Sequence, residues 1–277
     1  MYLEQQTAQI EQSINKKFRP LLWSPFVKAI KEYELIKEND RIAVCISGGK
    51  DSMCMAKMMQ MLQRYSDFPF EAVYLVMDPG YNELNRRRIE ENALILGLPI
   101  TVFETKIFDI ANSQDKSPCY LCAKMRRGAL YKKAQDLGCN KIALGHHFDD
   151  VIETTLIGMF YASKLEAMLP KLHSRNYEGM ELIRPLYKVH EEDIIAWKQY
   201  NDLNFIQCAC RFTEDCTICD NGGGGSKRQE IKKLIRELRK DNPDIEKSIF
   251  NSLHRVAIET FPGYKKDDRY HSFLEDF

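Results

Sequence analysis

The hydrophobic positions of this chain form short apolar runs separated by longer stretches in which apolar residues recur at helical spacing. The short runs predict strands over 41–46, 70–77, 100–104, 141–146, 182–187 and 205–210. The longer stretches predict helices over 53–65, 82–96, 119–137, 149–161, 190–200 and 226–240. Because strands alternate with helices, we expect an α/β fold whose doubly wound parallel sheet has helices on both faces.

The two ends of the chain are predicted to be helical additions to this sheet. Residues 1–37 have helical spacing with breaks at Pro20 and Pro25, which indicates an N-terminal helical appendage. Residues 38–210 then form the α/β domain, and 211–277 form a C-terminal cysteine loop with a basic helical segment. In that last part the apolar side chains recur at i, i+3, i+4 and i+7, namely at Ile231, Leu234, Ile235 and Leu238. The sequence GGGGS at 222–226 matches either a natural glycine loop or an artificial linker, and we assign it no chemistry.

Composition narrows the class of protein. The 277 residues include 40 Lys+Arg and 40 Asp+Glu and are 44% hydrophobic, which excludes a disordered chain and a globally basic binder. No apolar run approaches the roughly 18–20 residues of a membrane span. The N-terminus lacks the basic-then-apolar layout of a signal peptide, so we expect a soluble cytoplasmic protein with no membrane association. Positive charge is nevertheless local, with six Lys or Arg in 116–133 and seven in 227–240, which suits a nucleic-acid partner.

Nine cysteines are many for a cytosolic chain, where thiols stay reduced and clusters indicate metal binding or chemistry. Three are isolated in apolar surroundings and are expected to be small buried hydrophobes: Cys45, Cys54 and Cys139. The other six form two groups: Cys119 with Cys122, and Cys208, Cys210, Cys216 and Cys219.

The pair Cys119 and Cys122 forms a CxxC motif at the start of a predicted helix, which puts both thiols on one helix face. The positive end of the helix dipole favours their thiolate forms. A zinc half-site, a redox dithiol and iron–sulfur ligation all fit this pattern. A metal site would need further ligands, which the second cysteine group can supply.

The sequence Ser47-Gly48-Gly49-Lys50-Asp51-Ser52 follows a predicted strand and opens a predicted helix. Glycines let the backbone approach a ligand closely, and amides at a helix N-terminus point toward an anion. Hydroxyls at Ser47 and Ser52 add donors, and Lys50 adds positive charge. The spacing differs from GxxxxGK[ST], so we expect a phosphate site of another type.

This loop resembles the pyrophosphate-loop signature of the N-type ATP pyrophosphatases, the PP-loop superfamily with its nucleotide alpha hydrolase-like fold. The sequence Gly145-His146-His147-Phe148-Asp149-Asp150 resembles its second shared motif. The resemblance implies that residues 47–52, His146 and Asp149 bind ATP. It also implies that Lys50, Asp51 and Asp150 are catalytic, with the two aspartates positioning Mg²⁺ or substrate. From the residues alone, the histidines and Asp149 equally suit capping of the following helix.

Within the superfamily, the chain closely resembles the tRNA 2-thiocytidine synthetase branch over about residues 37–240. The resemblance is carried by the CxxC motif with Lys-Met-Arg-Arg-Gly after it, by 168–172 and by 183–186. It implies an ATP- and Mg²⁺-dependent tRNA sulfurtransferase that adenylates a pyrimidine carbonyl, expected to be a cytidine of the anticodon loop. Sulfur would then replace oxygen, releasing AMP and pyrophosphate, with a cysteine desulfurase or sulfide as sulfur donor. A homodimer is one assembly compatible with the sequence.

The same resemblance implies a [4Fe–4S] cluster held by three cysteines, which we assign to Cys119, Cys122 and Cys210. Alternatives for the third ligand are Cys208, Cys216 and Cys219. Together with Cys210, these cysteines also have the spacing of a zinc site. Other functions remain open at this point. They are a cluster-bearing small-molecule thiolase or desulfurase, a cluster-free ligase resembling tRNA lysidine synthetase, and a sensor of nucleotide or iron.

Overall fold

The computed structural model describes residues 2–112, 118–206 and 227–275. These residues form two compact units. The first contains the described residues up to Val151 and those from Met168 to Ile206. The second contains Ile152–Ala167 and the described residues from Lys227 onward. The domain division at 37/38 and 210/211 remains a prediction.

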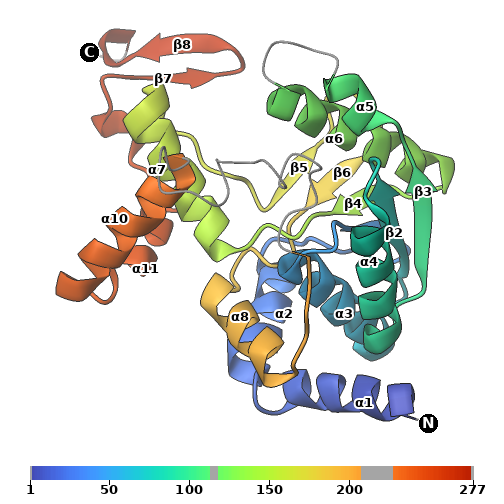
Figure 1. Cartoon of the computed structure of the whole chain (residues 1–277). Helices are drawn as coiled ribbons and strands as arrows, with labels where there is room; N and C mark the ends of the chain where they lie inside the picture. The colour runs from blue at the N-terminus through green and yellow to red at the C-terminus, as the bar shows by residue number, and fades with distance from the viewer. Residues whose placement is uncertain (1, 113–117, 207–226, 276–277) are drawn as a thin grey trace. The chain divides into compact units, whose positions relative to one another are not determined.

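The first unit is built on a six-stranded sheet with the strand order β3-β2-β1-β4-β6-β5 (Figure 1). Its strands are β1 (Arg41–Ile46), β2 (Glu71–Asp78), β3 (Ile100–Glu104), β4 (Lys141–Ala143), β5 (Lys171–His173) and β6 (Glu181–Ile183). All neighbouring strands pair in parallel except β5, which runs antiparallel to β6 at one edge. The predicted α/β fold with a parallel sheet is therefore confirmed.

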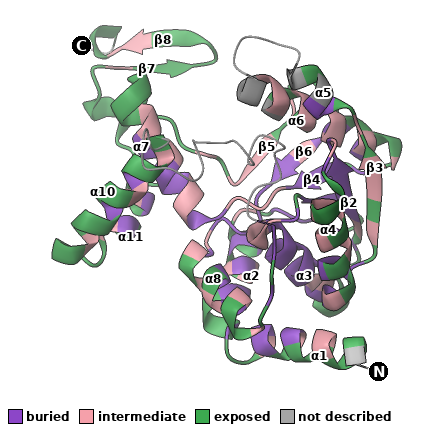
Figure 2. Ribbon diagram, in the orientation of Figure 1, coloured by how far each residue is buried: buried purple, intermediate pink, exposed green. Residues whose placement is uncertain are grey.

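Helices cover both faces of this sheet. They are α1 (Tyr2–Asn15), η1 (Arg19–Trp23), α2 (Ser24–Glu32), α3 (Lys50–Tyr65), α4 (Glu83–Leu96), α5 (Ile107–Asn112), α6 (Pro118–Asp136) and α8 (Glu191–Tyr200). Along β1, Ile42 and Val44 face a large core shared with α1, α2, α3, α4 and α8. Ala43 and Cys45 face a smaller core shared with α6. Both faces of β1 are buried from Ile42 to Ile46, which explains why its sequence is apolar without alternation. The helix α3, which packs against β1, is also mostly buried (Figure 2).

Several strand ends differ from the prediction. The strand predicted over 141–146 ends at Ala143 because the chain turns into Gly145. The strand predicted over 182–187 covers only Glu181–Ile183, since Pro185 has no amide to donate to a neighbouring strand. In the region of the strand predicted over 205–210, Phe205 and Ile206 do not form a strand. Residues 207–210 lie outside the described residues.

Two short elements were not predicted from the sequence. The strand β5 lies in the stretch 163–180, for which the sequence predicts irregular structure. The helix α5 lies in the predicted loop over 106–118. Both are shorter than the windows in which hydrophobic periodicity is informative.

The N-terminal helices pack onto the main core. Pro20 lies in the π-helical turn η1, and Pro25 occupies the first turn of α2, where its missing amide costs nothing. Ile10 and Phe26 are buried in the core that also contains β1. Glu11 of α1 also pairs with the fully buried Lys57 of α3 at 2.6 Å, so α1 neutralises a charge inside the unit.

The second unit contains most of α7 (Phe148–Ala162), whose first turn belongs to the first unit, followed by α10 (Lys227–Asp241) and α11 (Ile245–Ser252). It ends in η3 (Ile258–Thr260), the antiparallel hairpin β7 (Gly263–Lys266) and β8 (Arg269–Ser272), and η4 (Phe273–Glu275). The predicted apolar stripe of α10 is half confirmed. Ile231 and Ile235 are buried, whereas Leu234 and Leu238 are exposed. Among the helices of the described residues, none is both long and apolar enough to cross a membrane.

Candidate functional site

The loop 47–49 connects the end of β1 to the start of α3 and is closed by its own hydroxyls. The Ser47 amide donates to Ser52 Oγ at 3.1 Å, and Ser52 Oγ donates to the Gly49 carbonyl at 2.9 Å. In the described part of the chain, no side chain caps the N-terminus of α3. The first amides of α3 are therefore available to an anion, as the sequence predicts.

Glycine is required at Gly48 for two reasons. Its φ of +85° lies in the left-handed region, which side chains with a Cβ rarely adopt. A Cβ at this position would also lie 2.6 Å from Ile89 Cγ1 and 2.7 Å from Ile206 Cδ1. The side chains of Ile89 and Ile206 thus pack tightly against the loop at Gly48.

The second motif lies against the phosphate loop. A Cβ on Gly145 would lie 3.1 Å from both the amide nitrogen and the Cα of Ser52, so any larger residue would push this backbone away. The contact joins the segment after β4 to the start of α3. Strand β1 lies between β2 and β4, which makes this the point where the strand order reverses and where open α/β sheets bind ligands.

Lys50 is held by two carboxylates. Its Nζ lies 3.1 Å from Asp51 Oδ2 and 2.9 Å from Oε1 of Glu191, the first residue of α8. Burial is the largest influence and lowers the pKa of Lys50, but the two carboxylates outweigh it and hold the pKa above its usual value. The lysine is therefore a fixed cation beside the loop. Glu191 was not singled out by the sequence, because its partner is 141 residues away.

His147 is the centre of a group of aspartates. Its Nε2 lies 3.5 Å from Asp150 Oδ2 and 3.9 Å from Asp51 Oδ1, and its Nδ1 lies 3.6 Å from Asp149 Oδ2. Burial is the largest influence on its pKa and lowers it, yet the hydrogen bond to Asp149 and the charges of Asp150 and Asp51 raise the pKa above its usual value. Of the two histidines, only His146 is predicted from the sequence to bind ATP. The structure adds His147, which only the packing of α3 against the motif identifies.

The three aspartates have different roles in this arrangement. Asp149 Oδ2 accepts the backbone N–H of Glu191 at 2.7 Å, and Asp150 Oδ2 accepts that of His147 at 3.1 Å. Despite burial, which raises it, hydrogen bonds from His147 and Glu191 lower the pKa of Asp149 to about 2. Asp51 Oδ1 is buried and has no hydrogen-bond partner in the described structure.

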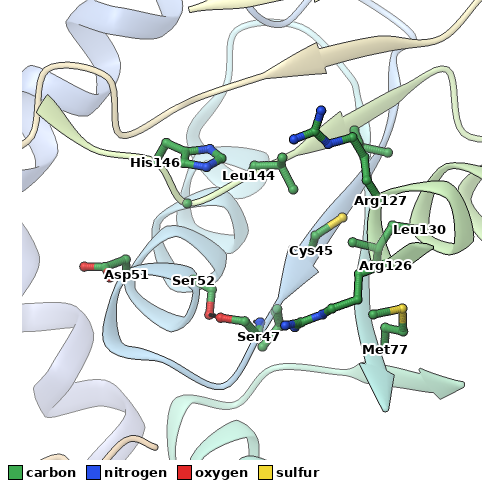
Figure 3. Close-up of a pocket in the computed structure, with 13 residues that line it drawn as sticks. Cys45, Ser47, Asp51, Ser52, Met77, Arg126, Arg127, Leu130, Leu144 and His146 are labelled. Atoms are coloured by element: carbon green, nitrogen blue, oxygen red, sulfur yellow. Dashed lines mark hydrogen bonds between the residues drawn. The ribbon is translucent and has the colours of Figure 1, made fainter. Parts of the chain in front are cut away.

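A cavity of about 350 Å³ opens beside the loop (Figure 3). Its apolar wall is made by Cys45, Ile46, Met77, Leu130, Ile142 and Leu144, and its polar wall by Ser47, Asp51, Ser52, Arg126, Arg127, Gly145 and His146. Such a mixture of apolar surface and convergent polar groups is typical of ligand pockets. Two arginines of α6 thus face the cavity, although the sequence analysis considered the basic stretch 116–133 only for an RNA partner.

The CxxC motif begins the same helix. Cys122 is half-buried and lies four residues before Arg126, so both are on one face of α6. Cys119 lies in the first turn of α6, but its side chain is outside the described structure, as are Cys208, Cys210, Cys216 and Cys219. Across residues 2–112, 118–206 and 227–275, no group of three or more His, Cys, Asp or Glu has metal-binding geometry. The isolated cysteines Cys45, Cys54 and Cys139 are buried, as predicted.

Comparison with known proteins identifies the family of this chain. The model of the PP-loop domain matches residues 9–211. The tRNA-cytidine(32) 2-sulfurtransferase of Citrifermentans bemidjiense is 39% identical over 233 residues, covering 83% of this chain and 88% of that protein. The enzyme of the same name from Geotalea daltonii is 40% identical with the same coverage.

Among solved structures, the fold is similar to the U34-tRNA thiolase NcsA from Methanococcus maripaludis with its [4Fe–4S] cluster. That similarity has a TM-score of 0.66 at 21% identity and covers 86% of this chain and 80% of the thiolase, which supports the fold. The loop, the second motif and the curated relatives lead to one assignment: the chain belongs to the PP-loop family, in the branch of the tRNA-cytidine(32) 2-sulfurtransferases.

Proposed function

We propose that this protein is an ATP-dependent sulfurtransferase that replaces the C2 oxygen of cytidine 32 of tRNA with sulfur. One observation carries the proposal: a single cavity is lined by the phosphate loop and by the helix that starts with CxxC. Relatives named tRNA-cytidine(32) 2-sulfurtransferase, which are 39–40% identical to this chain, support the reaction and the substrate. They favour a sulfurtransferase over a cluster-free ligase.

ATP binds at the Ser47 end of the cavity, toward which Arg126 extends. The amides at the start of α3, with the hydroxyls of Ser47 and Ser52, hold the phosphates. Lys50 and Arg126 add the positive charge that a triphosphate needs. The apolar side chains of Met77 and Ile142 suit the adenine ring.

Mg²⁺ is proposed at Asp51, with Asp150 beside it. The buried oxygen Asp51 Oδ1, which has no hydrogen-bond partner among the described residues, is a hard ligand of the kind that this ion prefers. When bound, the ion supplies charge neutralisation on the phosphates. His147 lies beside the same carboxylates, with Nε2 3.5 Å from Asp150 Oδ2 and 3.9 Å from Asp51 Oδ1.

A [4Fe–4S] cluster is proposed at Cys119, Cys122 and Cys210, with Cys208, Cys216 or Cys219 as alternatives for the third ligand. Cys122 fits such a role, because it lies near the positive end of α6, where thiolates are favoured, and packs against the large core. When bound, the cluster supplies an iron with an open position that can carry the sulfur to be transferred.

The reaction then has two balanced steps. The C2 carbonyl oxygen of the cytidine attacks the α-phosphate of ATP, the α–β bond breaks, and pyrophosphate leaves. Sulfide next attacks C2, the C2–O bond breaks, and AMP leaves with the former carbonyl oxygen. The amides of the loop and Arg126 stabilise the charge that develops on phosphate oxygens. Sulfide itself requires no oxidant or reductant. A cysteine desulfurase is an alternative source, because the persulfide that it forms releases sulfide when a thiol reductant supplies two electrons.

The target base must leave its loop to reach a cavity of this size, as in other enzymes that modify bases. Basic residues on α10 are proposed to contact the anticodon arm. We also propose a cytoplasmic location, where tRNA is available, and a homodimer as one assembly.

The direct test is a thiolation assay on protein reconstituted anaerobically with iron and sulfide. Protein, ATP, Mg²⁺, sulfide and unmodified tRNA are incubated, and digested nucleosides are analysed by mass spectrometry. We expect 2-thiocytidine in the wild type, less than 1% of that amount in Lys50→Met, and wild-type amounts in the exposed control Lys132→Gln. A product that forms equally well in Lys50→Met would show that the phosphate loop does not serve this reaction.

A further inference from the structure

Two consecutive arginines of α6 point toward different ends of the cavity. Figure 3 shows Arg126 extending toward Ser47, whereas Arg127 extends toward Leu144. Within the described residues, neither guanidinium has an ion pair or a hydrogen bond. Arg126 is half-buried and Arg127 is exposed. Two cations that line a cavity without a protein partner suit an anionic ligand. Because the two side chains diverge, one bound phosphate group does not serve both of them.

A third arginine lies near the Arg127 end. Leu144 donates its amide to the Ile183 carbonyl at 3.0 Å, so Arg184, the next residue, follows β6 beside the cavity wall. Arg184 is only 9% exposed. One of its Nη atoms bonds to the Leu169 carbonyl, while its Nε is buried with no partner in the described structure.

The electrostatics of Arg184 agree with a missing anion. Burial lowers its pKa to about 10 and the charge of Arg127 acts in the same direction, whereas the charge of Asp150 raises the pKa without outweighing them. Arg184 therefore remains a cation at neutral pH, close enough to Arg127 for the two charges to repel each other. A buried cation beside another cation is costly unless an anion lies between them.

We infer that Arg127 and Arg184 form a second anion subsite, separate from the phosphate loop, which binds a backbone phosphodiester of the substrate RNA next to the target base. The inference rests on the proposed function, since it takes tRNA as the substrate. ATP has its phosphates at the Ser47 end of the cavity, where Arg126 points. A nucleotide that leaves its stack brings its flanking phosphates with it, and these need cations at the other end.

The subsite is tested with an anticodon stem-loop RNA that carries one uncharged methylphosphonate on the 5′ side of nucleotide 32. For the wild type, we expect this RNA to bind about tenfold more weakly than the unmodified RNA. For Arg127→Gln, we expect both RNAs to bind equally and at the weaker level, with affinity for ATP within twofold of wild type. Lys132→Gln, on the exposed side of the same helix, should keep the full tenfold difference.

Arg184→Lys provides a second variant. It keeps a positive charge at this buried position, whereas Arg184→Gln would remove the charge and could prevent folding. We expect Arg184→Lys to retain ATP affinity and to reduce the methylphosphonate penalty, because an ammonium loses the forked contact of a guanidinium. A full tenfold penalty in Arg127→Gln overturns the subsite. So does a loss of ATP affinity in Arg127→Gln with RNA binding intact, which would assign Arg127 to the nucleotide. If the wild type bound no stem-loop at all, the proposed function would fall together with the subsite.

Discussion

Glu191 Oε1 lies 2.9 Å from Nζ of Lys50, so a carboxylate at the start of α8 holds the lysine of the phosphate loop. The backbone N–H of the same Glu191 donates to Asp149 of the second motif. Glu191 thus connects the two sequence motifs of the site. When ATP binds, its phosphates must compete with this carboxylate for Lys50.

The first prediction concerns that competition. Glu191→Gln removes an anion beside the phosphates and releases Lys50, so we expect ATP to bind about three- to tenfold more tightly, equivalent to roughly 1 kcal/mol. Isothermal titration calorimetry at low ionic strength measures the change. The exposed neighbour Glu192→Gln is the control and should leave the affinity unchanged. Weaker ATP binding by Glu191→Gln would mean that Glu191 supports the nucleotide instead of competing with it.

The second prediction concerns the close approach of Gly145 to α3. Gly145→Ala places a methyl group 3.1 Å from backbone atoms of Ser52, and backbone cannot move aside as a side chain can. We expect a loss of about 1–3 kcal/mol in the free energy of unfolding and at least tenfold weaker ATP binding. Gly128→Ala is the matched control, since a Cβ there meets only Tyr177 Oη at 3.4 Å and alanine favours the helix. Tight ATP binding by Gly145→Ala would show that the contact does not shape the loop.

The third prediction concerns pH. Because the pKa of Asp149 is about 2 in the folded protein, below its ordinary 3.8, its ionised form stabilises the fold at neutral pH. Asp149→Asn should cost about 2 kcal/mol of unfolding free energy at pH 7, and the difference from wild type should shrink as the pH falls from about 4 to 2. Urea denaturation over a pH series measures this. Burial raises the pKa of Asp193 on α8, so Asp193→Asn should show no such loss. A pH-independent cost in Asp149→Asn would contradict the account.

The fourth prediction concerns the cysteines. Cys122→Ser should lower the iron bound after anaerobic reconstitution to less than a third of wild type and abolish the brown colour, because serine is a poor ligand for this cluster. Cys139→Ser changes a buried cysteine of the smaller core and should keep the iron of the folded protein. Full iron binding by Cys122→Ser would remove this residue from the set of cluster ligands.

The fifth prediction concerns α10. Lys233 and Arg236 are exposed, and no ion pair is found for either among residues 2–112, 118–206 and 227–275. Replacing both by Gln should weaken tRNA binding and lower the slope of log affinity against log salt by about 1–2. Lys240 pairs with Glu237 at 2.6 Å, so Lys240→Gln should change the slope less. An unchanged slope in the double variant would exclude this helix from the RNA contact.

The sequence was most informative where function depends on consecutive residues. The phosphate loop from Ser47 to Ser52 was predicted with its strand and helix, since backbone anion sites need a fixed local order of glycines and donors. Contacts between distant segments were not predictable. Glu191, His147 and the direction of Arg126 depend on how α8, the second motif and α6 pack around the sheet. The third cysteine ligand stays a prediction, because Cys210 and its alternatives lie outside the described residues.

In the proposed reaction, the cytidine carbonyl attacks the α-phosphate of ATP. It is tested most directly with tRNA that carries ¹⁸O at C2 of cytidine 32, incubated with the reconstituted protein, ATP, Mg²⁺ and sulfide. The account predicts one ¹⁸O atom in AMP for each 2-thiocytidine formed, measured by mass spectrometry of both products. Thiolation with unlabelled AMP would contradict it.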